Sequence, residues 1–332
     1  MDLHALADDI RAGNRRALAR AITLVESSRD DHRAQASELL TILGTQRQAL
    51  RVGLSGTPGV GKSTFIESFG LMLTGQGLRV AVLAVDPSSA RSGGSILGDK
   101  TRMERLSRDP NAFIRPSPSQ SQLGGVARRS REAVALCEAA GFDVVLIETV
   151  GVGQSETQVS EMSDLFLLLL APAGGDELQG VKRGIMEIAD MILVNKADGE
   201  LKSQATRTCA DYAGALRLLR KRAQDPDDFP KALTVSAYEG AGLDASWDEI
   251  NTLVAWRKAN GIWDTRRSEQ ARYWFHEEVR MGLLSRLGKA GDLHDRMAQL
   301  EHEVSKGHQA PADAARQVID ALFAKETPKE TP

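Results

Sequence analysis

The residues best suited to chemistry lie in one glycine-rich segment, which fits the pattern G-x-x-x-x-G-K-S/T at every fixed position. Glycines allow the backbone to fold so tightly that its N–H groups can point at phosphate oxygens. We expect Lys62 to reach the β- and γ-phosphates of a nucleotide, and the Ser63 hydroxyl to bind Mg²⁺. The expected nucleotide contacts in this segment are Gly56, Thr57, Pro58, Gly59, Val60, Gly61, Lys62, Ser63 and Thr64.

A second motif has the sequence NKAD at residues 195–198 and directly follows an apolar run. It is similar to the N-K-x-D motif with which GTPases recognise their base. The carboxylate of Asp198 can accept hydrogen bonds from N1–H and the amino group of guanine, and adenine offers neither donor on that edge. Residues 236–237 resemble the loop that backs the guanine. The expected base contacts are Asn195, Lys196, Asp198, Ser236 and Ala237.

A third motif resembles a Walker B segment, because the apolar run Val144–Glu148 ends in an acid and Gly151 follows three residues later. We expect Glu148 to hold Mg²⁺ directly or through water, and Gly151 to let the backbone approach a γ-phosphate. Most small GTPases have Asp at this position, so the longer side chain of Glu148 favours a water-mediated contact.

Two loops offer further charged groups. The Gly/Ser-rich segment 86–102 carries Asp86 and Asp99, and its length predicts a switch loop ordered by Mg²⁺ and the γ-phosphate. The segment 174–184 carries Lys182, which could supply positive charge to a transition state. From the residues alone, the second segment is equally well read as a surface loop that enters a helix.

The elements that must position these motifs alternate along the chain. Apolar runs without strict polar alternation, separated by helical stretches, predict an α/β fold with a doubly wound, mostly parallel sheet. Ligands bind such sheets at the carboxyl ends of the strands. Strands are expected at Leu50–Ser55, Val80–Val85, Val144–Glu148, Leu165–Leu170, Met191–Asn195 and Leu233–Ser236, and helices at Lys62–Leu73, Val126–Ala140 and Ala205–Arg220.

The expected organisation is one nucleotide-binding domain, residues 46–245, with helical additions at both ends. Residues 1–45 read as helices with a break at Gly13-Asn14. Residues 246–325 read as a helical arm, in which Phe275, Val279 and Leu283 recur every four residues. The last segment, 326–332, is expected to be disordered.

Composition excludes several classes of protein. The 332 residues carry 42 Lys and Arg against 45 Asp and Glu, a net charge of −3, which argues against a bulk nucleic-acid binder. The longest apolar run, 165–173, is too short to span a bilayer, so no membrane partner is expected. Two cysteines, Cys137 and Cys209, exclude a disulfide framework. With no signal peptide in view, we expect a cytoplasmic protein.

The chain resembles the MeaB/ArgK family of P-loop GTPases, G-protein chaperones of adenosylcobalamin-dependent acyl-CoA mutases. The resemblance rests on GTPGVGKST, VLAVDPSSARSGGSILGDKTRM, FIRPSPS, IETVGVGQSE, GGDELQGVKRGI and NKAD. The resemblance implies that the protein hydrolyses GTP to GDP and phosphate and forms a homodimer through the C-terminal arm. It also implies a mutase partner: the GTPase would gate the loading of B12 into this mutase and would protect or reactivate it. It implies Mg²⁺-side roles for Ser63, Asp86, Asp99 and Glu148, and catalytic roles for Lys62, Asp99, Glu148 and Lys182.

Two other functions are compatible with this kind of fold. A metallocentre-assembly GTPase would need thiolate or imidazole ligands, but residues 33–275 contain no His and the two Cys lie far apart in sequence. An ATP-dependent small-molecule kinase would need a base for its substrate. The sequence shows none, and NKAD favours guanine.

Overall fold

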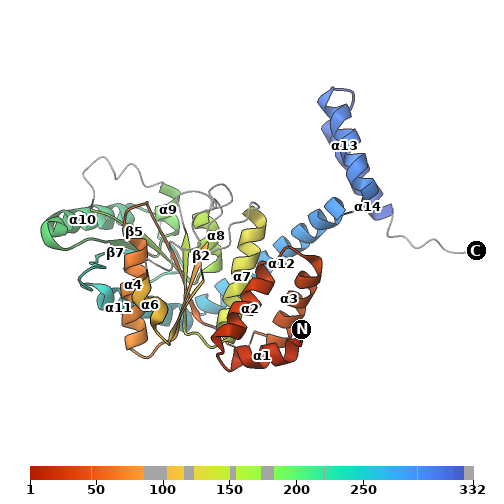
Figure 1. Ribbon diagram of the computed structural model, residues 1–332. Helices are drawn as coiled ribbons and strands as arrows, with labels where there is room; N and C mark the ends of the chain where they lie inside the picture. The colour runs from red at the N-terminus through yellow and green to blue at the C-terminus, as the bar shows by residue number, and fades with distance from the viewer. Residues whose placement is uncertain are drawn as a thin grey trace, which may run out of the picture. The chain divides into compact units, whose positions relative to one another are not determined.

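The computed structural model describes residues 1–45, 47–85, 103–115, 123–149, 155–172, 183–219, 221–289 and 291–324. Contacts divide the chain into two compact units, Met1–Ser268 and Glu269–Pro332. The first unit contains a seven-stranded sheet in the order β3-β2-β4-β1-β5-β6-β7 (Figure 1). Its strands are β1 (Leu50–Gly56), β2 (Val80–Val85), β3 (Ala112–Arg115), β4 (Val144–Thr149), β5 (Leu165–Leu170), β6 (Met191–Val194) and β7 (Lys231–Thr234).

Every pair of neighbouring strands runs parallel. All residues of β2, β4, β5 and β6 are buried, as expected for strands that are covered by helices on both faces. The predicted α/β class with a doubly wound parallel sheet is therefore confirmed. The predicted central strands also agree with the structure to within one residue at each end.

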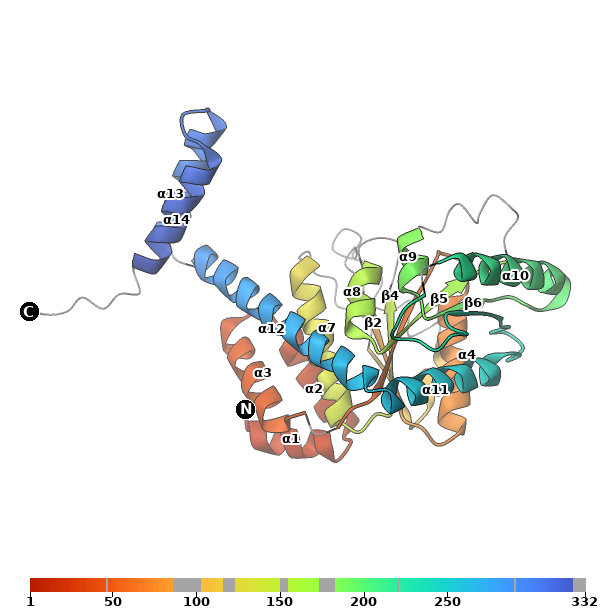
Figure 2. The ribbon, with the colours of Figure 1, turned by 180° about the vertical axis from the view of Figure 1, so that it is seen from behind.

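Helices cover both faces of this sheet (Figures 1 and 2). Phe65, Phe69 and Leu106, from α4 and α6, belong to a core cluster that also takes in the apolar side chains of one sheet face. On the other face, α7 contacts β2 and β4, and α8 contacts β1, β4 and β5. The helices are α4 (Lys62–Gly75), α6 (Glu104–Arg108), α7 (Leu123–Ala139), α8 (Ser155–Met162), α9 (Arg183–Ile188), α10 (Lys202–Leu218) and α11 (Leu243–Ala259), with a 3₁₀ turn at Gly199–Leu201.

The N-terminal helices belong to the first unit. They are α1 (Leu3–Arg11), α2 (Arg15–Glu26) and α3 (Asp30–Leu43). The expected break falls at Gly13, whose φ is +77°, and the Asn14 side chain caps α2 by accepting from two backbone N–H groups. Both α2 and α3 pack against α7, and Arg33 of α3 forms a half-buried ion pair with Glu132 of α7 at 2.6 Å.

The C-terminal helices are divided between the two units. Leu243, Ile250 and Leu253 of α11 belong to the core, and Trp247 meets Phe69 edge-on with ring centroids 6.0 Å apart. The first unit therefore extends beyond residue 245, the boundary expected from the sequence. Helix α12 (Ile262–Lys289) begins in the first unit and ends in the second. The second unit also contains α13 (Gly291–Ser305) and α14 (Pro311–Ala324), which contact each other.

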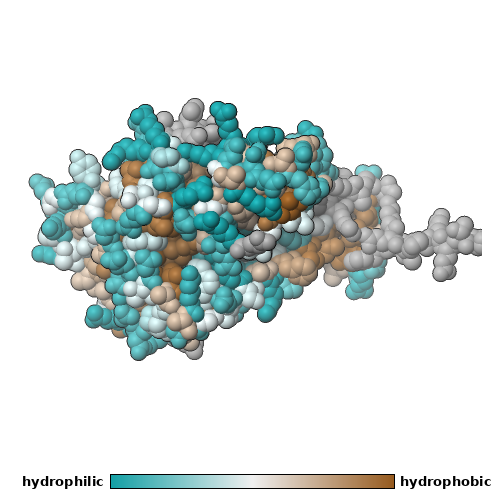
Figure 3. Space-filling model, turned by 90° about the horizontal axis from the view of Figure 1, so that it is seen from below, coloured by the Kyte–Doolittle hydropathy of each residue, from teal (hydrophilic) through white to brown (hydrophobic). Residues whose placement is uncertain are grey.

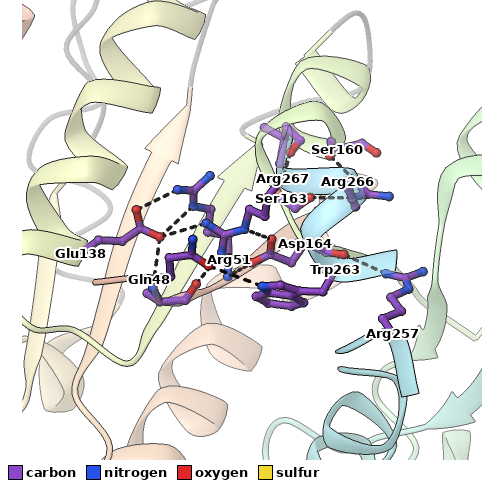
Figure 4. Close-up of polar contacts among 12 residues, drawn as sticks. Gln48, Arg51, Glu138, Ser160, Ser163, Asp164, Arg257, Trp263, Arg266 and Arg267 are labelled. Carbon is purple, nitrogen blue, oxygen red and sulfur yellow. Dashed lines mark hydrogen bonds and ion pairs between the residues drawn. The ribbon is translucent and has the colours of Figure 1, made fainter. Parts of the chain in front are cut away.

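A buried polar cluster occupies the amino-terminal edge of the sheet (Figure 4). The Arg51 guanidinium pairs with Glu138 at 2.7 Å, and Arg267 of α12 pairs with Asp164 just before β5. Arg266 donates to the carbonyl oxygens of Ser160 and Ser163 at the end of α8. These contacts attach the first turns of α12 to the starts of the strands.

A second set of buried ion pairs lies at the same edge of the sheet. Arg257 of α11 donates to the Asp164 carbonyl at 2.8 Å and to the carboxylate of Asp190, which directly precedes β6, at 2.6 Å. It also pairs with Asp225, and Arg222 pairs with both of these acids. Burial raises the pKa of Asp190, but Arg257 and Arg222 outweigh that effect and hold its pKa below the ordinary value.

Two strands differ from the sequence-based prediction. Strand β3, Ala112–Arg115, was not predicted. Strand β7 covers Lys231–Thr234 instead of Leu233–Ser236, because the chain turns after Thr234 into a loop in which the Ser236 N–H donates to the carbonyl of Ala241 at 2.9 Å. The last strand prediction was therefore wrong by two residues at each end.

The surface seen from below is mostly hydrophilic, with hydrophobic residues gathered in patches between hydrophilic ones (Figure 3). None of the helices in the described part of the chain is long and apolar enough to cross a membrane.

Candidate functional site

The glycine-rich motif forms the turn between β1 and α4, at the carboxyl edge of the sheet. Gly59 and Gly61 have φ values of +82° and +88°, a region that side-chain-bearing residues rarely adopt. A Cβ atom on Gly56 would lie 2.4 Å from the carbonyl oxygen of Leu169 on the neighbouring strand. The sequence therefore needs glycine at these three positions to make this turn.

Lys62 is held above this turn. Its Nζ donates to the carbonyl oxygen of Gly56 at 2.6 Å, which folds the side chain back over the loop. Burial lowers the pKa of Lys62, and the negative charges of Glu148 and Glu156 oppose that effect. Glu148, at the end of β4, is 6% exposed, and Glu156, in the first turn of α8, is 1% exposed. The lysine is thus a cation among buried acids, in the place where a nucleotide's phosphates would meet the loop.

Glu156 was not among the residues predicted from the sequence. Its signal was weak, because the Glu of the GQSE stretch looks like an ordinary acid in the first turn of a helix. Its burial in the structure marks it as part of the electrostatic environment of Lys62. Close by, the hydroxyl of Thr149 donates to Ser55 at 3.1 Å and links the ends of β4 and β1.

The NKAD segment lies directly against the glycine-rich turn. The side-chain amide of Asn195 donates to the carbonyl oxygen of Val60 at 2.9 Å, and Lys196 Nζ donates to that of Gly59 at 2.7 Å. Lys196 has a positive φ of 58°, uncommon for a residue with a side chain, which turns the chain sharply after β6. Two motifs more than 130 residues apart in the sequence are thereby joined into one site.

The expected base-binding residues also meet. The Ser236 hydroxyl donates to the carboxylate of Asp198 and accepts from the backbone N–H of Glu239 at 3.0 Å. The backbone N–H of Ala237 donates to the side-chain oxygen of Asn195 at 3.0 Å. These bonds fix the orientation of the Asp198 carboxylate. An oriented carboxylate beside a phosphate-binding turn is the arrangement that a guanine nucleotide requires.

Several predicted residues lie outside the described part of the chain. They are Asp86, Asp99, Gly151 and Lys182. For Mg²⁺, the described donors are the hydroxyl of Ser63, at the start of α4, and the buried carboxylate of Glu148. Both are oxygen ligands of the kind that Mg²⁺ prefers, and the ion commonly needs only one or two protein groups because phosphates and water complete its shell. These residues therefore fit a Mg²⁺–nucleotide complex.

Comparison with known proteins identifies the family. The family described as "Methylmalonyl Co-A mutase-associated GTPase MeaB" matches residues 18–292. The chain belongs to this family. It is 52% identical to a "Putative GTPase" of Caulobacter vibrioides, over 97% of this chain and 98% of that protein. It is 48% identical to the "Methylmalonic aciduria type A homolog, mitochondrial" of Mus musculus, over 93% of this chain and 77% of that protein.

Two further relatives support the same assignment. The "GTPase ArgK" of Escherichia coli is 44% identical, over 94% of each chain. A crystal structure described as "LAO/AO transport system kinase" is 37% identical and superposes with a TM-score of 0.74, over 97% of each chain. The MeaB-family chain is thus a P-loop GTPase that binds GTP and GDP and hydrolyses GTP, as predicted.

Proposed function

We propose that this GTPase serves as a G-protein chaperone of an adenosylcobalamin-dependent acyl-CoA mutase, gating the loading of the B12 cofactor and protecting or reactivating the enzyme. The observation that carries the guanine-nucleotide part is the pairing of Asp198 with Ser236 beside the glycine-rich turn. The mutase part is supported by the family description and by the name of the mouse relative. We place the reaction in the cytoplasm, where Cys137 and Cys209 would stay free thiols.

In the proposed site, the backbone of residues 56–64 and the Lys62 ammonium bind the phosphates, while Asp198 and the 236–237 loop hold the guanine. Ser63 and Glu148, with Asp86 and Asp99, would hold Mg²⁺, which would neutralise negative charge on the phosphates. Two further roles are proposed from the family resemblance: Gly151 would let the backbone approach the γ-phosphate, and Lys182 would place a positive charge near it during hydrolysis. Glu148 and Glu156 oppose the lowering of the Lys62 pKa by burial, which supports a role of its ammonium toward phosphate.

We further propose that the chain forms a homodimer through its second unit. Helix α12 leaves Phe275, Val279 and Leu283 exposed by 63%, 46% and 41%, at a spacing that aligns them on one side of the helix. Replacing Val279 and Leu283 by Asp should yield a monomer by light scattering that still hydrolyses GTP. A dimer that persists at the same concentration would contradict this part of the proposal. Lys221→Asp, an exchange at an exposed position of the first unit, is the control and should leave the dimer intact.

The alternative functions make different demands on the protein. A metal-delivery role would need thiolate or imidazole ligands, whereas residues 33–275 contain no His and the two Cys lie far apart in sequence. A kinase role, which the description of one relative suggests, would require ATP. Equal affinity of the wild-type protein for ATP and GTP would therefore overturn the guanine assignment, and Asp198→Ala should remove the preference for GTP.

The decisive experiment combines the purified chain with cobalamin-free acyl-CoA mutases that act on methylmalonyl-CoA, isobutyryl-CoA, ethylmalonyl-CoA or 2-hydroxyisobutyryl-CoA. We expect one of them to raise the rate of GTP hydrolysis, and its loading with adenosylcobalamin to depend on the bound nucleotide. Lys62→Ala should abolish both effects, and Lys202→Ala, a surface exchange, should preserve them. If no mutase changes hydrolysis and no loading step responds to nucleotide, the chaperone proposal fails.

A further inference from the structure

One hydrogen bond near the nucleotide site comes from a residue outside all of the motifs. The hydroxyl of Ser68, in the middle of α4, donates to the carbonyl oxygen of Ala237 at 2.6 Å. Helix α4 begins at the phosphate-binding turn, and Ala237 belongs to the base loop. Ser68 therefore ties the phosphate side of the site to the base side by a second route, independent of Asn195.

Together the two routes form a closed ring. Asn195 donates to the carbonyl of Val60 and accepts from the N–H of Ala237, whose carbonyl in turn accepts from Ser68. The backbone of α4 then leads from Ser68 back to Gly61. This ring holds the peptide groups on both sides of Ala237. The 236–237 peptide is held through its N–H, and the 237–238 peptide is held through its carbonyl.

The Ser68 contact fixes the direction of a backbone donor. In a trans peptide, the carbonyl and the following N–H point in opposite directions. Because the Ala237 carbonyl points at Ser68, the N–H of Tyr238 points away from α4. Within the described ranges, no residue accepts a hydrogen bond from this N–H, and the residue itself is 88% exposed. The loop thus offers a free donor two residues after Ser236, which holds the Asp198 carboxylate.

We propose that Ser68 is a positioning residue for base selection, which orients the 237–238 peptide so that its N–H donates to the 6-oxo group of the purine. The inference rests on the guanine site proposed above. When Asp198 accepts from N1–H and the 2-amino group, the 6-oxo group is the next group along the edge of the base. A fixed N–H there matches an oxo acceptor and opposes the 6-amino group of adenine, a donor.

The size of the effect follows from the kind of bond involved. Loss of one neutral hydrogen bond of this type corresponds to about a 3- to 10-fold loss of affinity. Replacing Ser68 by Ala should not harm the helix, because Ala has a higher helix propensity than Ser. A weaker affinity in this variant would therefore report on the loop and not on α4.

The test measures dissociation constants of the full chain for GDP, IDP and 6-thio-GDP. All three keep N1–H, but 6-thio-GDP replaces the 6-oxo group by sulfur, a weak acceptor. Ser68→Ala should weaken GDP and IDP equally, by about 3- to 10-fold, and 6-thio-GDP by clearly less. Ser68→Thr, which keeps the hydroxyl, should restore most of the GDP affinity.

The outcomes separate the two proposals. Equal loss for all three nucleotides would mean that Ser68 only stabilises the loop, and unchanged GDP affinity in Ser68→Ala would mean that it does not position the peptide. Either result overturns the inference while leaving the guanine site intact, provided that the wild-type protein prefers GDP to ADP. If the wild-type protein binds ADP as tightly as GDP, the guanine site itself is wrong.

Discussion

Replacing Arg257 by Met should destabilise the protein strongly without altering its nucleotide site. The Arg257 side chain is 2% exposed, and the carboxylates of Asp190 and Asp225 that it pairs with are 1% exposed. Removing one partner from a buried ionic cluster typically costs about 3–5 kcal/mol, because the remaining charges stay out of water. Arg222 would remain as a partner of both acids, so we take the lower value, about 3 kcal/mol.

In a unit of this size, each kcal/mol shifts the thermal midpoint by about 2–4 °C, so Arg257→Met should lower it by about 6 °C or more. Differential scanning calorimetry of the GDP-free protein measures this directly. The control is Lys221→Met, which removes an exposed pair with Asp227 and should leave the midpoint unchanged. At 20 °C, GDP should bind the folded variant with wild-type affinity. A shift below 1 °C, or one no larger than that of the control, would refute the reasoning.

Three further predictions concern the sheet and its two edges. Gly53→Ala should cost about 1–3 kcal/mol of folding free energy, measured by chemical denaturation, because the new Cβ would lie 2.6 Å from Ser163 Oγ. The control is Gly75→Ala, which has open space around it and should be neutral in the same measurement. Lys62→Ala should remove the largest charged contact to the phosphates, so that GTP binds far more weakly than to the wild-type protein in calorimetric titrations while guanosine binds about equally; tight GTP binding would contradict the site. Because the pKa of Asp190 is lowered in the folded protein, the stability that its charge contributes is present above about pH 4 and is lost as the pH falls. The difference in thermal midpoint between wild type and Asp190→Asn should therefore shrink from pH 7 to pH 3. A constant difference would contradict the assigned charge.

The carboxyl edge of the sheet could largely be predicted from the sequence. Each motif there directly follows an apolar strand, and parallel strands bring their carboxyl ends to one edge. That rule alone places Lys62, Glu148 and Asp198 near one another. The shift of β7 was not predictable in this way. The strand begins with the charged Lys231, and Val235 is apolar and still donates to the Val194 carbonyl, so only the hydrogen bonds of the following loop mark where the strand ends.

The amino edge of the sheet could not be predicted. Arg257 lies in a helix next to Lys258 and Asn260, where a charged side chain is expected to be exposed. Its burial depends on Asp190 and Asp225, which are distant in sequence and reach it only through the completed fold. Strand β3 was missed for a related reason, since a four-residue stretch at the edge of the sheet carries too little pattern to distinguish it from a loop.

The separation of the two edges has a consequence for natural variation in this chain. At the amino edge, Arg51, Asp164 and Arg257 serve the folded state, so exchanges there should reduce the amount of protein in the cell while sparing the activity of each surviving molecule. At the carboxyl edge, exchanges at Lys62 or Asp198 should leave normal amounts of an inactive protein. We therefore expect growth at lower temperature to rescue loss-of-function alleles at the amino edge of the sheet. It should not rescue alleles at the carboxyl edge.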